Sequence, residues 1–409
     1  MRIVQKFGGT SVGGLERIRK TADIIEGALK QGHEIAVVVS AMSGETNRLL
    51  ALAHELDGHP YPREKDALVA TGEQVSAALV AIELRRRGIA AYSYNGIQAG
   101  FRTDSRHARA RIRNIESAHL IRHMQAGEVP VVAGFQGADE HGNITTLGRG
   151  GSDTSAVALA IAVEADVCDI YTDVNGVYTT DPRIVPQAKK INRISYEEML
   201  EFASLGARVL QTRSVELAMR YGMPIHLRSA FEPVAGTMVV EEEDNMERAA
   251  ISGVAYNRDE AKITILGIPD HPGIAASVFG PVADAGINVD VIVQNVSEQG
   301  HTDITFTVPR SDYQATLDIM QGIRRQMEAR DVQGDDTVAK VSIIGVGMRS
   351  HAGVAKQMFD VLAREGINIQ MITTSEIKVT VVIEEKYVEL AVRALHAAFG
   401  LDDSGGEQG

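Results

Sequence analysis

The ten residues at 145–154 hold three glycines, a guanidinium group, a carboxylate and several hydroxyl groups, and an apolar helical pattern over 155–163 follows at once. A glycine loop that leads into a helix presents free backbone N–H groups and the positive end of the helix dipole, which suits an anion. Arg149 adds a rigid fork that matches a carboxylate or a phosphate. These residue types predict a site for a small, negatively charged ligand.

A second glycine segment, 6–11, follows the strand-like run at 3–7. Its glycines would let backbone N–H groups approach phosphate oxygens, and Lys6 would reach the same oxygens as a point charge. Taken alone, the segment would more often be only a lysine beside a tight turn at a strand end. It is not a P-loop, because the pattern GxxxxGK[ST] occurs nowhere in the chain.

Three further places carry side chains suited to ligand binding, each with a purely structural alternative. The hydroxyl groups of 40–47 follow a strand, which suits a polar substrate or a turn with a helix cap. Glu73 lies in a helical pattern, either as a ligand-binding carboxylate or as a solvated charge. The segment 171–183 joins a strand end, a turn glycine, aromatic rings and two carboxylates, typical of a nucleotide pocket or of a surface loop. Arg208 alone would be a helix-surface charge.

The elements that must position these side chains alternate along the first 230 or so residues. Strand-like runs at 3–7, 35–40, 129–135, 168–172 and 224–227 alternate with amphipathic helical stretches such as 15–29, 65–87 and 195–221. Short apolar strands separated by helices predict a three-layer α/β fold, a mainly parallel sheet covered on both faces. The carboxyl ends of its strands meet at one edge, so the loops should form one anion-binding crevice there.

Composition narrows the class of protein. A length of 409 residues predicts two or three domains, and a net charge of −13 without a basic stripe argues against a nucleic-acid binder. The one cysteine, Cys168, excludes an internal disulfide framework and reads as a buried small hydrophobic residue. We find neither a signal peptide nor an apolar run of the roughly 20 residues that a membrane span needs, and therefore expect a cytoplasmic protein.

An internal repeat occupies the last third of the chain. Residues 271–288 align without a gap on 351–368, and eight of the 18 positions are identical. Each copy follows an apolar strand and precedes two alternating strands and a helix, the pattern of a ferredoxin-like module. The second copy lacks a fourth strand, because the chain ends in a polar tail. We expect the strand at 251–256 to complete the second copy, so that the first copy is an insertion within it.

Five segments in combination resemble the aspartate kinases of the amino-acid kinase family: KFGGTSV at 6–12, VVSAMSGETN at 38–47, TGEQ at 71–74, TTLGRGGSDT at 145–154 and YTDVNGVYTTDPR at 171–183. The repeats resemble the paired ACT domains that follow the kinase domain in that family. The resemblance spans essentially the whole chain. Its one variation is Arg208, where many relatives carry lysine, which is still a cation.

The resemblance implies an order of domains. It implies a kinase catalytic domain at 1–240, a linker at 241–250, a first ferredoxin-like (βαββαβ) ACT domain at 262–336, a second built from 251–256 and 337–401, and a disordered tail at 402–409.

The resemblance also implies a reaction, the ATP- and Mg²⁺-dependent phosphorylation of the β-carboxylate of L-aspartate to L-4-aspartyl phosphate. That reaction begins the lysine, threonine and methionine (diaminopimelate) branch of amino-acid biosynthesis. A carboxylate acceptor is already ionised at neutral pH, so no general base is needed. The difficulty is to bring one anion against another, which cations and oriented dipoles relieve. We expect Mg²⁺ to arrive with ATP rather than on protein ligands.

Roles for individual residues follow from the same resemblance. The expected catalytic residues are Lys6, Arg149 and Asp153, with Asp153 as an organiser rather than a base. The expected substrate contacts are Ser40, Thr46, Glu73, Arg149, Gly150, Gly151 and Ser152, with Arg149 on a carboxylate and Glu73 on the ammonium. The expected ATP contacts are Lys6, Phe7, Gly8, Gly9, Tyr171, Thr172, Asp173, Val177, Tyr178, Thr179, Thr180, Asp181, Pro182, Arg183 and Arg208.

The ACT repeats imply feedback inhibition by lysine, threonine or both. Each repeat offers a strand-to-helix turn whose amides suit an amino-acid carboxylate, although the same residues also fit a helix cap and turn. The expected regulatory contacts are Asp270, Gly273, Ile274, Ala275, Asn288, Val289, Asp290 and Gln294 in the first copy, and Val354, Ala355, Asn368, Ile369, Thr374 and Ser375 in the second. Asp270 has an uncharged counterpart, Ser350, so the two sites should differ.

Other readings remain open from the sequence. The chain could be another amino-acid kinase, acting on glutamate, acetylglutamate, carbamate or a nucleotide. It could also be a catalytically dead amino-acid sensor, which would bind amino acids at the repeats without transferring phosphate. The ACT repeats imply a homodimer or higher oligomer. Met246, just before the repeats, is a possible start for a separately translated regulatory subunit.

Overall fold

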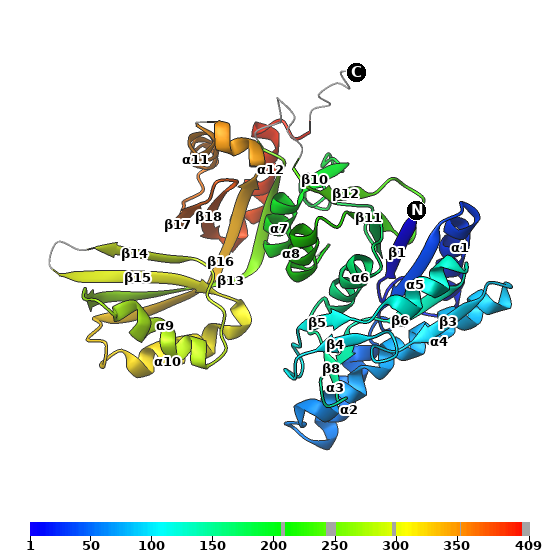
Figure 1. The fold of residues 1–409 in the computed structure, drawn as a ribbon. Helices are drawn as coiled ribbons and strands as arrows, with labels where there is room; N and C mark the ends of the chain where they lie inside the picture. The colour runs from blue at the N-terminus through cyan, green and yellow to red at the C-terminus, as the bar shows by residue number, and fades with distance from the viewer. Residues whose placement is uncertain (206–208, 243–250, 297–299, 352, 403–409) are drawn as a thin grey trace. The chain divides into compact units, whose positions relative to one another are not determined.

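The computed structural model describes the chain except for residues 206–208, 243–250, 297–299, 352 and 403–409, which include Arg208, Met246 and most of the expected linker and tail (Figure 1). The chain forms two compact units. The first comprises Met1–Tyr178, Lys190–Ser204 and Arg208–Met246, and the second comprises Thr179–Lys189, Leu205–Ala207 and Glu247–Gly409.

The first unit is built on an eight-stranded sheet with the order β10-β12-β11-β9-β1-β2-β6-β3. Its strands are β1 (Arg2–Phe7), β2 (Glu34–Val39), β3 (Ala91–Tyr94), β6 (Val129–Ala133), β9 (Val167–Thr172), β10 (Arg193–Ser195), β11 (Ile225–Ser229) and β12 (Thr237–Val240). Every pair is parallel except β11 with β12. The carboxyl ends of β1, β2, β6 and β9 therefore lie side by side at one edge.

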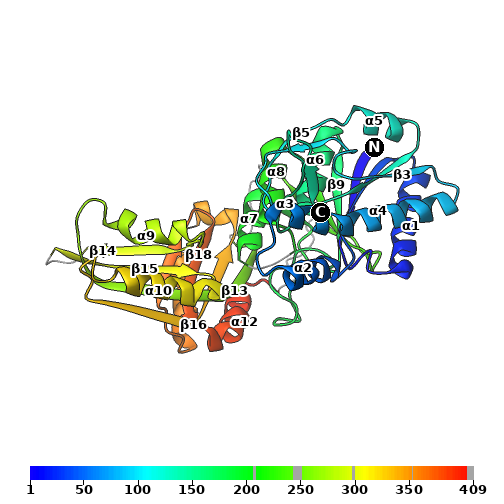
Figure 2. The same ribbon diagram turned by 90° about the horizontal axis from the view of Figure 1, so that it is seen from below.

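Helices cover both faces of this sheet, which confirms the predicted three-layer fold (Figures 1 and 2). They are α1 (Leu15–Lys30), α2 (Glu45–Leu56), α3 (Pro62–Val69), α4 (Thr71–Arg86), α5 (Ala118–Gln125), α6 (Gly151–Ala162), α7 (Tyr196–Ser204) and α8 (Thr212–Tyr221). Ile3, Val37 and Val131 face α1 and α4 in one apolar cluster. Because strand side chains alternate, Lys6 faces the opposite side, where α6 packs against β1.

A smaller four-stranded sheet, with the order β5-β4-β7-β8, extends the first unit. It contains β4 (Phe101–Thr103), β5 (Ile112–Ile115), β7 (Gln136–Ala138) and β8 (Ile144–Thr146). The hairpin of β7 and β8 matters for function, because β8 leads directly into the glycine segment and α6.

The structure divides two stretches that the sequence pattern presents as single helices. The stretch at 65–87 becomes α3 and α4, which meet at Ala70, and the carbonyl of Ala70 accepts a hydrogen bond from Nε2 of Gln136 at 2.7 Å. The stretch at 195–221 becomes α7 and α8. By length and composition alone, the helical stretch 62–86 is long and apolar enough to cross a membrane. In the structure, however, 56% of its most apolar part is buried inside the fold.

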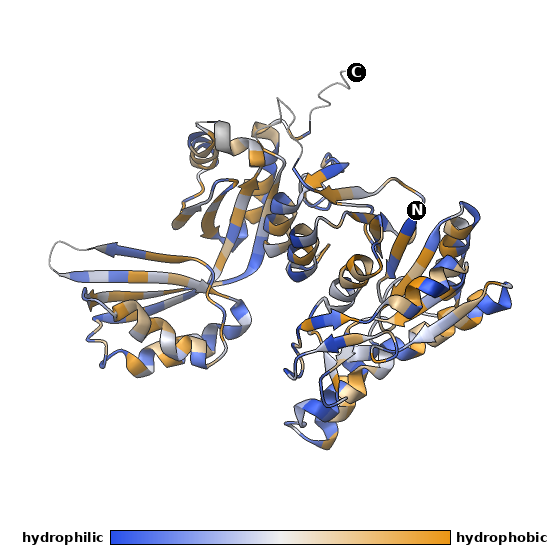
Figure 3. Cartoon of the chain, viewed as in Figure 1, coloured by the Kyte–Doolittle hydropathy of each residue, from blue (hydrophilic) through white to orange (hydrophobic). Residues whose placement is uncertain are grey.

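The second unit contains a six-stranded sheet with the order β14-β15-β13-β16-β18-β17. Its elements are β13 (Gly253–Pro269), α9 (Ile274–Asp284), β14 (Ile292–Val296), β15 (His301–Val308), η1 (Arg310–Asp312), α10 (Tyr313–Ile323), β16 (Asp331–Ile344), η2 (Val346–Ser350), α11 (Val354–Arg364), β17 (Met371–Thr374), β18 (Lys378–Glu384), η3 (Glu385–Tyr387) and α12 (Val388–Ala398). Bands of hydrophobic and hydrophilic residues alternate along the helices (Figure 3), as expected where one helix face is buried.

Two long strands link the repeats within this sheet. The runs at 251–256 and 263–267, which look separate in sequence, lie in the single strand β13. Gly253–Tyr256 pair with the end of β16, whereas Ile263–Leu266 pair with its beginning. The pairing register shifts on both sides of Glu260, where one half of β13 gives way to the other. Such irregularities bend a strand, so the two halves can belong to two different modules.

The segment 179–189 is part of the second unit. Val185 packs in the apolar cluster that also contains Ile251, Val341 and Val392. Thr179 Oγ1 hydrogen-bonds to Nε2 of His396 at 2.9 Å, and the backbone oxygen of Thr179 accepts from the amide of Val254. The segment is therefore held by buried contacts on both its polar and its apolar side.

Candidate functional site

A buried ion pair lies at the carboxyl edge of the large sheet. Lys6 near the end of β1 and Asp153 in the first turn of α6 are each 8% exposed, and Lys6 Nζ lies 2.6 Å from Asp153 Oδ1. The sheet fixes the lysine and the helix fixes the carboxylate, so neither side chain depends on a loop for its place. The pair places the ammonium group of Lys6 beside the glycine segment that follows β1, with Asp153 as its counter-ion.

The glycines after β1 bring the backbone close to this charge. A side chain at Gly8 would place its Cβ 3.5 Å from Nζ of Lys6, and one at Gly9 would place it 2.8 Å from the carbonyl oxygen of Ala41. Gly8 also donates to the carbonyl of Tyr171 at 3.2 Å. Without side chains, the backbone at Gly8 passes close to Lys6 and the backbone at Gly9 packs tightly against Ala41, and this glycine cradle fits a phosphate group.

Two aromatic rings join the ends of neighbouring strands. The rings of Phe7 and Tyr171 stack with centroids 4.7 Å apart and planes at 9°. Burial raises the pKa of the Tyr171 hydroxyl, and nearby Asp169 acts in the same direction. Both residues belong to the expected nucleotide contacts, and both rings are buried in the apolar cluster that faces α1 and α4.

The segment at 147–151 is a tight backbone loop. Gly148 and Gly150 adopt left-handed φ values of 82° and 65°. A Cβ at Gly150 would lie 1.8 Å from Cγ of Gln211, and one at Gly151 would lie 2.6 Å from the ring of Phe135. Arg149 between them is exposed, and no ion pair joins it to the described residues. Its guanidinium group is therefore available to an anion from solution.

The remaining expected substrate residues stand at the same edge. Glu73 is 3% exposed, and its Oε1 accepts from the amide of Ala41, next to Ser40, at 3.1 Å. Its Oε2 is buried with no hydrogen-bond partner among the described residues, and burial raises the pKa of Glu73 to about 7. Thr46 lies in the first turn of α2, and Ser152 lies in the first turn of α6. An orphaned buried carboxylate oxygen suits an ammonium group.

The other expected nucleotide residues fall in two units. Thr172 ends β9, and Asp173, Val177 and Tyr178 follow it in the first unit, whereas Thr179, Thr180, Asp181, Pro182 and Arg183 belong to the second. Within the second unit, Asp181 pairs with Arg183 at 2.8 Å and accepts from the hydroxyl of Tyr256. Arg208 lies outside the described residues.

The expected regulatory residues occupy matching places in the second unit. Gly273 precedes α9 and Gly353 precedes α11, with left-handed φ values of 97° and 100°. Asp270 is exposed, as are Asn288 and Gln294 in the first repeat and Asn368, Thr374 and Ser375 in the second. Ile274 is buried, whereas Val289, Val354, Ala355 and Ile369 are half-buried. Both repeats therefore start their helices in the same way.

Asp290 has a partner that the sequence did not suggest. Lys340, on β16, is only 1% exposed and forms ion pairs with Asp290 and, at 2.8 Å, with Glu260 of β13. Burial raises the pKa of Glu260, which Lys340 partly opposes. The available signal was a lone lysine within the apolar strand 338–344.

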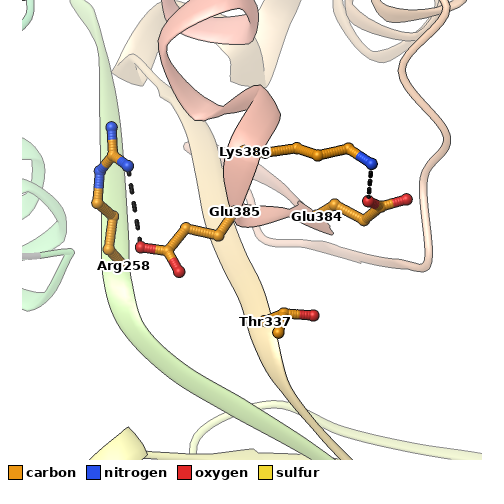
Figure 4. Close-up of a pocket in the computed structure, with 5 residues that line it drawn as sticks. All are labelled: Arg258, Thr337, Glu384, Glu385 and Lys386. Atoms are coloured by element: carbon orange, nitrogen blue, oxygen red, sulfur yellow. Dashed lines mark ion pairs between the residues drawn. The ribbon is translucent and has the colours of Figure 1, made fainter.

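One cavity of about 310 Å³ lies away from all of these residues. It is lined by Arg258, Thr337, Glu384, Glu385 and Lys386 (Figure 4). Arg258 pairs with Glu385 at 3.8 Å and Lys386 with Glu384 at 2.5 Å, so the charges satisfy one another. The cavity does not coincide with the site predicted from the sequence.

Comparison with known proteins identifies the class. The profile of the amino acid kinase family matches residues 1–229, and that of the ACT domain matches 263–321 and 341–399. The chain therefore belongs to the amino acid kinase family, with two ACT domains after the kinase fold.

Relatives narrow the family to one activity. The aspartate kinase Ask_LysC of Stutzerimonas stutzeri is 58% identical over 99% of this chain and 98% of its own length, and the aspartokinase of Helicobacter pylori is 48% identical over 98% and 100%. The crystal structure of Escherichia coli aspartokinase III in complex with aspartate and ADP has a TM-score of 0.81 at 29% identity, covering 97% of this chain and 99% of that one. Within its family, the chain is an aspartate kinase.

Proposed function

We propose that the enzyme transfers the γ-phosphoryl group of ATP to the β-carboxylate of L-aspartate and releases L-4-aspartyl phosphate and ADP. The observation that carries this proposal is the buried Lys6–Asp153 pair beside the Gly8–Gly9 cradle, with the side chain of Arg149 exposed on the adjoining loop. One cation serves the phosphates and the other serves the acceptor.

The phosphate side works through fixed charge. Lys6 and the amide of Gly9 would stabilise the negative charge that spreads over the transferring group, whereas the amide of Gly8 donates to the carbonyl of Tyr171. Mg²⁺ bound with ATP would supply further positive charge. Asp153 holds Lys6 in place and has no proton to remove, because the acceptor carboxylate is already ionised.

A second group of residues would bind the acceptor, L-aspartate. Arg149 would clamp a carboxylate of aspartate, and the orphaned Oε2 of Glu73 would receive the ammonium. Ser40, Thr46, Ser152 and the amides of Gly150 and Gly151 would complete the polar contacts. On the nucleotide side, Phe7 and the residues at 171–178 of the first unit would contact ATP.

A steady-state assay with ATP and each candidate acceptor tests the reaction. Trapping with hydroxylamine detects the acyl phosphate directly, because hydroxylamine converts it to a stable hydroxamate. We expect ADP and hydroxamate in equal amounts with aspartate and neither with glutamate, acetylglutamate, carbamate or UMP. ADP release without hydroxamate would contradict carboxylate phosphorylation.

We also infer a regulatory and cellular setting. Residues 1–240 would form the catalytic domain, 262–336 the first ACT domain, and 251–256 with 337–401 the second. Lysine, threonine or both would bind at the ACT turns and favour an inactive arrangement. The enzyme would act in the cytoplasm as a dimer or higher oligomer, at the start of lysine, threonine and methionine synthesis. Repeating the assay with each effector, and with both, tests the feedback.

A further inference from the structure

A buried carboxylate outside the expected site joins two segments near the glycine loop. Asp66, in α3, is 1% exposed. It accepts hydrogen bonds from Nδ1 of His107 and from the amide of Ala108, both at 3.0 Å. It also accepts from the amide of Thr146 at 3.0 Å and from the hydroxyl of Thr146 at 2.7 Å. One side chain thus ties α3 to the loop at 107–108 and to the end of β8.

Arg213, in α8, holds the same region from its other side. Its guanidinium group donates to the carbonyl oxygens of Leu147 and Ala110, each at 2.8 Å. The amide of Ala110 in turn donates to the carbonyl of Thr146 at 2.8 Å. Both backbone groups of Thr146 and the carbonyl of Leu147 are therefore fixed immediately before the glycine loop.

The glycine loop then packs against the same supports. A Cβ at Gly148 would lie 2.9 Å from the carbonyl oxygen of Ala108, whose amide is bound by Asp66. Gly150 packs against Gln211, two residues before Arg213. The backbone on both sides of Arg149 is held by groups that the sequence motifs do not include, while its side chain stays exposed.

We propose that Asp66 and Arg213 are positioning residues for Arg149, holding the loop at 147–151 so that the guanidinium group is already oriented when the acceptor carboxylate arrives. This inference rests on the proposed role of Arg149 as the carboxylate clamp. Pre-orientation matters because small displacements of a binding group cost much of its effect. Neither residue contacts substrate in this scheme, and both act through the backbone.

The neighbouring Asp139 provides a matched control. It is also a buried aspartate, 3% exposed, and it accepts from the amides of His141 and Asn143 at the opposite end of the β7–β8 hairpin. No hydrogen bond joins it to the loop at 147–151 among the described residues. Asp139→Asn therefore removes a comparable buried carboxylate while the hydrogen bonds of Asp66 and Arg213 stay in place.

The experiment compares Asp66→Asn, Arg213→Lys and Asp139→Asn in the full-length enzyme, with thermal unfolding to verify folding. We expect Asp66→Asn to raise the aspartate KM about ten- to a hundredfold while the ATP KM changes less than about twofold. Arg213→Lys should raise the aspartate KM less, because a lysine holds only one carbonyl well. Asp139→Asn should leave both KM values unchanged. Equal effects of Asp66→Asn on both KM values, or the same effect from Asp139→Asn, would overturn the proposal.

A double-mutant cycle separates this inference from the role of Arg149 itself. If Asp66 acts through Arg149, Asp66→Asn should add little to the aspartate KM of Arg149→Gln. Full additivity would overturn the positioning role and leave the clamp intact. An unchanged KM in Arg149→Gln alone would instead refute the clamp, so the two failures are distinguishable.

Discussion

The two cations of the site, Lys6 and Arg149, are built in opposite ways. Lys6 lies on a central strand, is nearly buried and has Asp153 as a partner at 2.6 Å. Arg149 lies on a loop, is exposed and forms no ion pair with the described residues. One charge is part of the core and the other is presented to solvent.

This difference matches the two ligands of the proposed reaction. A phosphoryl group must be met by charge that does not rearrange during transfer, which a strand and a helix provide. An acceptor must enter and leave, so its clamp has to be reachable and its support has to come from elsewhere. Asp66 and Arg213 supply that support for Arg149, as Asp153 does for Lys6. We therefore expect loss of Lys6 to affect turnover and loss of Arg149 to affect affinity.

Lys6→Ala gives the largest expected effect. Turnover should fall by about a thousandfold or more, because the transferring group loses its main protein cation. Thermal stability should also fall, since Asp153 keeps a buried charge without its partner. The double variant Lys6→Ala with Asp153→Asn should recover stability but not activity in melting and steady-state assays. Recovered turnover would show that Lys6 acts only through Asp153.

Arg149→Gln should act on the other side of the comparison. We expect the aspartate KM to rise about ten- to a hundredfold, the cost of one charge-assisted contact of about 1.5–3 kcal/mol, with a smaller change in kcat. The melting temperature should stay constant because the side chain is exposed. Arg113→Gln, which removes another exposed arginine of the first unit, serves as the control and should change nothing. A fall in kcat at constant KM would show that Arg149, like Lys6, acts on turnover rather than on aspartate affinity.

Gly150→Ala tests the loop that carries Arg149. Its Cβ would overlap Gln211 in a backbone with φ of 65°, so the free energy of unfolding should fall by about 1–3 kcal/mol. Gly142→Ala is the matched control, because Gly142 has φ of 79° but open space around its Cβ position. Chemical denaturation measures both. Equal losses would assign the whole cost to backbone conformation rather than to the contact with Gln211.

Glu73 gives the smallest effect, a pH dependence of aspartate affinity. Its pKa of about 7 lies above the usual value because of burial, so the carboxylate that would bind the ammonium is lost as the pH falls through 7. The aspartate KM should be about tenfold higher at pH 6 than at pH 8. Glu73→Gln should have a high KM that no longer varies over this range.

Ionisation of Glu73 also has a consequence for stability. In the free enzyme the folded state holds this proton more tightly than the unfolded state, so stability contributed by the neutral acid is lost as the pH rises towards 7. Glu73→Gln should therefore melt higher than the parent enzyme at pH 8 and similarly at pH 5. The opposite order would contradict a raised pKa.

Much of the catalytic unit is predictable from the sequence. Apolar runs such as 35–40 and 168–172 locate β2 and β9, because strands buried on both faces leave a continuous signal. Lys6 and Asp153 carry their signal in glycine-rich motifs. Asp66 and Arg213 carry none, because they act on backbone groups distant in the sequence. Their function appears only once the chain has folded.

The ends of helices and strands are harder to predict, because they too depend on residues distant in the sequence. At Ala70, where α3 meets α4, the carbonyl oxygen accepts from the side chain of Gln136, a partner that no local pattern indicates. Lys340 looks misplaced in an apolar strand until Glu260 and Asp290 are brought beside it. Local pattern identifies elements, whereas tertiary partners decide where an element stops and which polar residue is tolerated inside.

The membership of 179–189 in the second unit has a consequence for how the protein is made. The chain leaves the ribosome from its N-terminus, so this segment emerges before any of its core partners, among them Val254, Val341 and Val392. The full set of residues that pack against Val185 is present only after about 200 further residues have been synthesised. Synthesis of α12 then completes the apolar cluster that contains Val185, a residue synthesised much earlier. We expect nascent chains truncated before 388 to be cut by protease within 179–189, and complete chains to resist.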